Sequence, residues 1–280
     1  MHATRARYAG WTTRRWESPG VGTPVVLLHG FTDSGHSWSG VLGALARSGR
    51  SAVAVDLPGF GSADVLAPGP ILPQLDRFVA DLVSVEGRGG PVVLVGNSLG
   101  ALAALRAAAA GAPLDGVVLL SEPSCGDRAL IRLFRRRRLG PLALLGLPVP
   151  LPRPIVHRLL VAGAARAVGR GPLDPDAPSR IADFVIGRGG PAWALRTARQ
   201  LALESIDCHD FDAVTCPVLV AHGARDMIIP VNSAELIHAR IPHSVLDVRR
   251  RWGHCPQIEF PDEVAAAVLG FVDGVARRTA

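Results

Sequence analysis

The chain has 280 residues, 48% of them hydrophobic, so it can bury a large core and form one domain with an added subdomain. Its formal net charge is +6, but with a single tyrosine and no aromatics among the basic residues it does not resemble a nucleic-acid-binding protein. The sequence has no apparent secretory signal and no apolar run long enough to span a bilayer, so we expect a cytoplasmic protein. The scattered cysteines lack metal-ligand spacing and indicate neither a metal site nor a disulfide framework: Cys125, Cys208, Cys216 and Cys255.

Strands and helices are predicted to alternate along the first 120 residues. Short β-branched runs predict strands near 25–28, 52–55, 92–95 and 115–120. Helical patterns between them predict helices near 37–47, 73–86 and 98–110. This alternation is typical of a parallel sheet flanked by helices, so we predict the α/β class.

The alternation is interrupted once and then resumes. Residues 122–209 contain proline-rich connectors and predicted helices near 155–168, 178–187 and 191–204. After them, the pattern predicts a strand near 218–222, a helix near 231–240, a strand near 244–248 and a helix near 261–273. We therefore expect a core formed by residues 1–121 and 210–280, with residues 122–209 inserted as a helical subdomain.

The segment Gly96-Asn97-Ser98-Leu99-Gly100 lies between a predicted buried strand and a predicted helix. A G-x-S-x-G pattern in that position predicts a nucleophile elbow, a sharp turn that exposes the serine hydroxyl at the carboxyl end of the sheet. The close passage of strand and helix requires small residues two positions before and after the serine, and both positions are glycine. Ser98 is therefore the candidate nucleophile.

A serine nucleophile needs a histidine to accept its proton and a carboxylate to orient that histidine. Asp226 follows the predicted strand near 218–222, and His254 lies in the loop after the next strand, so these two residues are our candidates for acid and base. Glu122, directly after the strand near 115–120, is an alternative acid. We interpret His222 as packing near Asp226 without taking part in the chemistry.

The order Ser98, Asp226, His254, together with two further loops, makes the chain resemble an α/β-hydrolase of the single-domain, lid-bearing kind. The loops are Val25–Thr32, which contains His29-Gly30, and Val55–Ser62, which contains Pro58-Gly59. The resemblance implies that the oxyanion hole is formed by the backbone N–H groups of Phe31 and Leu99. It also implies that residues 122–209 form a cap over the serine. We interpret His29 as a structural brace for the oxyanion loop and Asp56 as an acceptor for loop amides.

These residues indicate a serine hydrolase that cleaves carboxylic esters of small apolar substrates through an acyl-enzyme, without a metal or organic cofactor. Apolar cap residues predict a hydrophobic roof, with Trp38, Trp193 and Leu145 as candidate pocket residues; for the two tryptophans, packing in the core is the favoured alternative. Asn97 before the serine is similar to the elbow of carbon–carbon bond hydrolases that act on vinylogous diketones, although Leu99, Ala101 and Cys255 depart from that group. A further alternative is a non-hydrolytic ligand-binding or lyase-like homologue.

The arginine run 135–138 is interpreted as a solvated face of the cap, with attraction of an anionic substrate as the alternative. Cys255, beside His254, is expected to line the pocket rather than to act as a nucleophile. The expected partner is a small ester-like molecule, with no nucleic acid and no membrane span. Nothing in the sequence sets the oligomeric state.

Overall fold

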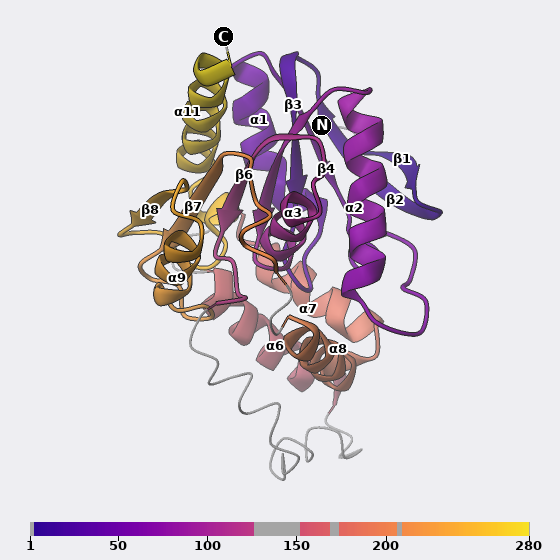
Figure 1. Cartoon of the computed structure of the whole chain (residues 1–280). Helices are drawn as coiled ribbons and strands as arrows, with labels where there is room; N and C mark the ends of the chain where they lie inside the picture. The colour runs from indigo at the N-terminus through magenta and orange to yellow at the C-terminus, as the bar shows by residue number, and fades with distance from the viewer. Residues whose placement is uncertain (1–2, 126–151, 169–173, 206–208, 280) are drawn as a thin grey trace.

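The computed structural model of the chain describes residues 3–125, 152–168, 174–205 and 209–279 (Figure 1). Its centre is an eight-stranded sheet in the order β1-β2-β4-β3-β5-β6-β7-β8. The pairs β1–β2 and β2–β4 are antiparallel, and the remaining pairs are parallel. The strands are β1 Ala3–Tyr8, β2 Trp11–Ser18, β3 Val21–Leu28, β4 Arg50–Val55, β5 Val92–Asn97, β6 Leu114–Leu120, β7 Val218–Gly223 and β8 Val245–Arg249.

Every strand predicted from the sequence is present, but the N-terminal hairpin β1–β2 was not predicted. Its strands are rich in arginine and threonine and contain only a few large apolar residues, so they lack the apolar run that identified the inner strands. Ala9 and Gly10 join the two strands, with φ of 47° and 95°. Positive φ at both turn residues is the geometry that matches the twist of a tight hairpin.

Helices cover both faces of the sheet and bury two separate apolar clusters (Figure 1). Helices α2, α3 and α9 pack on one face, and α1 and α11 pack on the other. The inner strands β5 and β7 are buried along their whole length, which explains their mostly apolar sequences. These helices are α1 Ser39–Arg47, α2 Leu72–Gly87, α3 Leu99–Ala109, α9 Asn232–Arg240 and α11 Pro261–Thr279.

Between β6 and β7 the chain leaves the sheet, and the described part of this insertion contains the helices α6 Arg153–Val168, α7 Ala177–Gly187 and α8 Gly190–Glu204. Figure 1 shows them gathered beyond the carboxyl ends of the strands. Their bounds lie within two residues of the predicted ones. Ligands of open α/β sheets bind at this edge, so the inserted helices α6, α7 and α8 cover the expected position of a site. No helix in the described ranges is long and apolar enough to cross a membrane.

Two short helices were not predicted as separate elements. Gly35–Trp38 forms a one-turn 3₁₀ helix, η1, directly before α1, and Pro256–Glu259 forms α10 directly after the His254 loop. Elements of four residues carry too little periodicity to be recognised in a sequence.

Candidate active site

Ser98 lies at the turn between β5 and α3, with φ of 51° and ψ of −112°. A non-glycine residue rarely adopts positive φ, and holding one there costs about 1–3 kcal/mol. A Cβ atom on Gly96 would lie 2.2 Å from the backbone of Gly100, and one on Gly100 would lie 2.2 Å from the carbonyl oxygen of Leu28. Both glycines are therefore required by close backbone contacts, as the sequence predicted for a nucleophile elbow.

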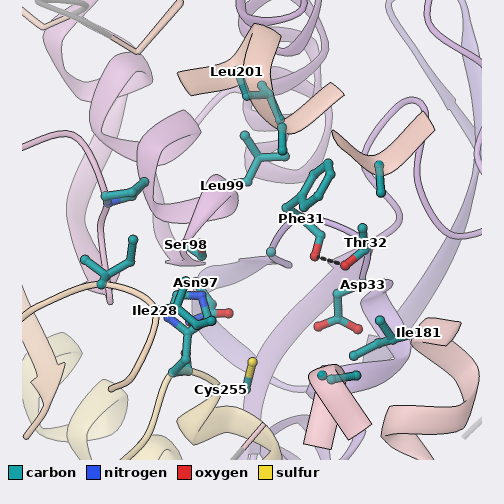
Figure 2. Close-up of a pocket in the computed structure, with 18 of the residues that line it drawn as sticks. Phe31, Thr32, Asp33, Asn97, Ser98, Leu99, Ile181, Leu201, Ile228 and Cys255 are labelled. Atoms are coloured by element: carbon teal, nitrogen blue, oxygen red, sulfur yellow. Dashed lines mark hydrogen bonds between the residues drawn. The ribbon is translucent and has the colours of Figure 1, made fainter. Parts of the chain in front are cut away.

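Ser98 lines a cavity of about 500 Å³ between the sheet edge and the inserted helices (Figure 2). The inserted helices contribute an apolar wall that includes Leu160, Val185 and Leu201. Leu99 and Leu102 of α3 line the cavity as well. The volume lies in the range of small-molecule sites, and most of the lining is aliphatic, as such sites usually are.

His254 lines the same cavity and contacts Asp226: its Nδ1 lies 2.8 Å from Asp226 Oδ2. A carboxylate only accepts, so Nδ1 carries the proton, which leaves Nε2 of a neutral ring free to accept another. Asp226 Oδ1 also accepts hydrogen bonds from the N–H groups of Ile228 at 2.8 Å and Ile229 at 2.9 Å. Burial raises the pKa of Asp226, but the hydrogen bond from His254 and these amides outweigh burial, and the net pKa is lowered.

A second histidine lies beside the same carboxylate. His222 Nε2 lies 3.5 Å from Asp226 Oδ2 and 3.0 Å from the carbonyl oxygen of Ile229, to which it donates. Burial lowers the pKa of His222, so the ring is neutral at pH 7. The expectation that His222 packs near Asp226 is therefore confirmed, and its hydrogen bond to Ile229 closes the loop that carries Asp226.

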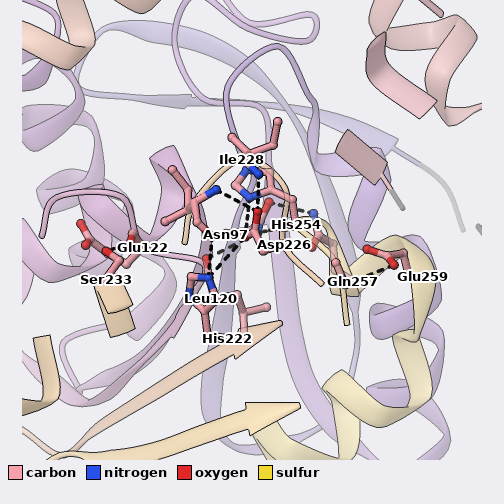
Figure 3. A network of polar contacts seen from close by, with 12 residues as sticks. Asn97, Leu120, Glu122, His222, Asp226, Ile228, Ser233, His254, Gln257 and Glu259 are labelled. Carbon is pink, nitrogen blue, oxygen red and sulfur yellow. Dashed lines mark hydrogen bonds and ion pairs between the residues drawn. The ribbon is translucent and has the colours of Figure 1, made fainter. Parts of the chain in front are cut away.

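Glu122, the alternative acid, contacts a different histidine. Its Oε1 lies 3.5 Å from His209 Nε2, and both side chains are buried. Its Oε2 accepts hydrogen bonds from the N–H and hydroxyl groups of Ser124, both at 2.8 Å. The Ser233 hydroxyl donates to the Glu122 carbonyl oxygen at 2.7 Å. Glu122 thus joins the two ends of the 122–209 segment to α9, and His254 is held by Asp226 instead (Figure 3).

The loop after β3 lies beside Ser98, and Phe31 and Leu99 both line the cavity. Leu99 is the first residue of α3, so its N–H has no intrahelical acceptor and is available to a ligand. His29 is fully buried; its Nδ1 lies 2.7 Å from the carbonyl oxygen of Gly30, and its Nε2 accepts from the Leu57 N–H at 2.9 Å. His29 therefore has the structural role expected for it.

Asp56 accepts hydrogen bonds from the N–H groups of Gly35 and Ser62, at 2.8 and 2.7 Å, as expected for an acceptor of loop amides.

Asp33 lines the cavity two residues after Phe31. Burial raises the pKa of Asp33 to about 6, although the neighbouring Ser37 hydroxyl and Ser34 amide favour its ionised form. Above pH 7 this wall of the cavity carries a negative charge, which disfavours anionic groups of a substrate there.

Neither of the two tryptophans named as candidate pocket residues belongs to the cavity lining. Trp38 is fully buried in the apolar cluster under α1, because η1 turns its side chain toward the core. Trp193 stacks on Phe31, with ring centroids 6.2 Å apart, and is not part of the cavity lining. Leu145 lies outside the described residues, as do Cys208 and the arginine run 135–138. Cys255 lines the cavity as predicted, and burial raises the pKa of its thiol.

Sequence reasoning missed a group of polar side chains that hold the backbone around His254. Asn97 donates to the His254 carbonyl oxygen at 2.8 Å, and Gln257 donates to Asn97 Oδ1 at 3.2 Å. Glu259 Oε2 accepts the Gly253 N–H at 3.3 Å. The signal in the sequence was their position next to Ser98 and His254, but pairing them requires knowledge of how the two loops meet.

Glu259 carries a pH prediction. Burial raises its pKa from 4.5 to about 7, against the amides of Cys255 and Gly253, which lower it. The folded state therefore binds this proton more tightly than the unfolded state, so the stability that the neutral form contributes is complete below pH 4.5 and is lost as pH rises toward 7. Glu259→Gln stays neutral, so its free energy of unfolding relative to wild type is expected to increase by about 2 kcal/mol between pH 4.5 and pH 8.

Urea unfolding at several pH values measures this difference. Glu235→Gln, at an exposed glutamate on α9, is the matched control for loss of one carboxyl group. A difference between Glu259→Gln and wild type that stays constant across this pH range would show that Glu259 does not titrate as described.

Comparisons with known proteins identify the family of the chain. Residues 25–267 match the model of the Alpha/beta hydrolase family. An esterase of Mycobacterium tuberculosis is 30% identical to this chain, over 92% of this chain and 85% of its own length. A pimeloyl-[acyl-carrier protein] methyl ester esterase of Neisseria meningitidis is 27% identical, over 94% of this chain and 98% of its own.

Among solved structures, a serine hydrolase involved in carbazole degradation has a TM-score of 0.71 at 23% identity, and the match covers 97% of this chain and 98% of that one. At this identity the likeness shows the fold alone. The family match covers most of the chain, including both segments that form the sheet. The chain therefore belongs to the alpha/beta hydrolase family.

Proposed function

We propose that the chain is a serine hydrolase that cleaves carboxylic esters of small apolar substrates through an acyl-enzyme. The observation that carries this proposal is the strained Ser98 on the wall of an apolar cavity that also contains His254, hydrogen-bonded to Asp226. The names of the esterase relatives add support for hydrolysis of an ester.

In the proposed reaction, His254 Nε2 accepts the Ser98 proton as the hydroxyl oxygen attacks the ester carbonyl carbon. The negative oxygen that forms is stabilised by the N–H groups of Phe31 and Leu99. The imidazolium then protonates the departing alcohol, and the acyl group remains on Ser98. Water, deprotonated by His254, attacks the acyl-enzyme and releases the acid. Asp226, whose pKa is lowered, stays ionised and stabilises the imidazolium at each stage.

The division of the chain follows from the same proposal. Residues 1–121 and 210–280 form the catalytic core, and residues 122–209 form the cap that selects the substrate. The apolar side chains that the inserted helices add to the cavity favour an apolar acyl or aryl group. The negative charge of Asp33 favours a neutral one.

The similarity of the Asn97-Ser98 pair to carbon–carbon bond hydrolases has another explanation in this structure. Both polar ends of the Asn97 amide already bind the protein, one to the His254 carbonyl and one to Gln257. The presence of Asn97 is therefore explained by these contacts without a diketone substrate, and ester hydrolysis remains the preferred function.

A substrate panel tests the proposal: p-nitrophenyl acetate, butyrate and octanoate, a thioester, a lactone and a vinylogous diketone. We expect turnover of the neutral esters. Turnover of the diketone without the esters would instead support the carbon–carbon bond hydrolase. Folded protein that turns over none of them would support a non-hydrolytic homologue.

A further inference from the structure

Asn97 connects the two loops that carry the proposed nucleophile and base (Figure 3). It is the last residue of β5 and directly precedes Ser98, and its Nδ2 donates to the backbone carbonyl oxygen of His254 at 2.8 Å. The side chain is only 1% exposed, so water does not compete for this bond. One side chain thus ties the residue next to the nucleophile to the backbone of the base.

The orientation of the Asn97 amide is fixed by its other contacts. Gln257, in α10, donates from Nε2 to Asn97 Oδ1 at 3.2 Å, so Nδ2 is the end that faces His254. The same Nδ2 lies 3.4 Å from the carbonyl oxygen of Leu120 on β6. Gly30 packs against the opposite side, where an added Cβ would lie 3.1 Å from Asn97 Oδ1. The amide therefore has little freedom to move.

The backbone of the His254 loop is held from a second direction as well. Glu259 accepts the Gly253 N–H, and an added Cβ on Gly253 would lie 2.6 Å from Glu259 Oε1. The imidazole itself is held by Asp226 at Nδ1. Asp226 holds the His254 ring, and Glu259 holds one side of the loop. Asn97 differs from both because it lies on β5, the strand that leads into Ser98.

We propose that Asn97 is a positioning residue that sets the distance between the Ser98 hydroxyl and the His254 ring through its hydrogen bond to the His254 carbonyl oxygen. The inference rests on the proposed serine-hydrolase function. A displacement of about 1 Å between reacting groups can lower a rate by about 10²-fold, because proton transfer depends steeply on their alignment. Substrate binding depends on the cavity walls and is affected much less.

Asn97→Ala removes the bond. We expect kcat for p-nitrophenyl butyrate to fall by about 10- to 100-fold while KM changes by less than about threefold. The rate constant for phosphonylation of Ser98 by a fluorophosphonate is expected to fall in parallel, since that reaction uses the same nucleophile and base. Gln257→Met keeps the Asn97 amide but removes the hydrogen bond that fixes its orientation. We expect this variant to lower kcat and the labelling rate by less than Asn97→Ala does.

Asn97→Asp separates positioning from general destabilisation. Its ionised carboxylate cannot donate and would face the His254 carbonyl oxygen, whereas its protonated form can donate in the place of the amide. A buried, unpaired carboxyl group has a raised pKa. The activity of Asn97→Asp relative to wild type is therefore expected to increase as pH falls from 8 to 5.5, and that of Asn97→Ala is not. Asn97→Ala, which introduces no charge, is the reference for the pH dependence of the groups already present in the site.

Ser244→Ala is the matched control, because it removes another buried hydrogen bond to a backbone carbonyl, 2.7 Å from the Ile241 oxygen, at the far end of β8. Its kcat is expected to stay near that of wild type.

The inference is wrong if Asn97→Ala keeps the wild-type kcat and labelling rate, if it raises KM alone, or if the activity of Asn97→Asp does not recover at low pH. Should Asn97→Ala not fold, Gln257→Met and Asn97→Asp decide. Wild-type protein that neither hydrolyses esters nor reacts with the fluorophosphonate would instead overturn the proposed function.

Discussion

Replacing Ser98 by alanine is expected to lower hydrolysis of p-nitrophenyl esters by at least about 10³-fold, because the acyl-enzyme can no longer form. The fold should persist, since the substitution removes only a hydroxyl group. Alanine keeps the Cβ that strains the turn, so the strain at φ of 51° is unchanged. Initial rates across the ester panel, measured at equal concentrations of folded protein, give the loss.

Circular dichroism and the thermal midpoint serve as controls for Ser98→Ala and should match the wild-type values closely. Ester hydrolysis at wild-type rates by this variant would remove Ser98 from the reaction. It would also remove the acyl-enzyme from the proposed mechanism.

The second large effect is expected for Asp226→Asn, with kcat lowered by up to about 10⁴-fold and KM little changed. An asparagine amide can donate to Nδ1 of His254, which favours the tautomer with its proton on Nε2 and blocks removal of the Ser98 proton. It also removes the negative charge that stabilises the imidazolium. Steady-state kinetics on one ester at saturating substrate measure the loss.

Glu122→Gln is the matched control, since it replaces the other candidate carboxylate by its amide. Glu122 contacts His209 and Ser124 rather than His254, so the kcat of this variant is expected to stay close to wild type. If Glu122→Gln loses most of its activity while Asp226→Asn stays close to wild type, Glu122 rather than Asp226 is the residue that orients His254.

The turn at Ser98 and the contact between His254 and Asp226 could be predicted from local sequence and from the order of the parallel strands. Gly96 is required by its close approach to Gly100 within the turn itself, and Asp226 follows a buried strand with an apolar sequence. Parallel strands bring their carboxyl ends to one edge of the sheet, so the loops of Asp226 and Ser98 had to meet there. The order of the parallel strands thus allowed two local sequence patterns, at Ser98 and at Asp226, to be placed close together.

Other features depended on packing between distant segments and left no such pattern. A tryptophan at position 38 looks the same in the sequence whether its side chain faces a pocket or the core. The conformation of η1 places the Trp38 side chain in the core. The bond from Asn97 to His254 crosses 157 residues, and the contact between Glu122 and His209 closes a whole insertion. Residue type alone could not pair these side chains, because each has many possible polar partners in the chain.

The most direct test of the proposed mechanism is to find the residue that becomes covalently modified. Wild-type protein, Ser98→Ala and Asp226→Asn are incubated with a fluorophosphonate, and the adduct is located by peptide mass spectrometry. We predict one adduct on wild-type protein, at Ser98, no adduct on Ser98→Ala, and slow labelling of Asp226→Asn. Folded wild-type protein that remains unlabelled, or that carries the adduct on another residue such as Cys255, would contradict the account.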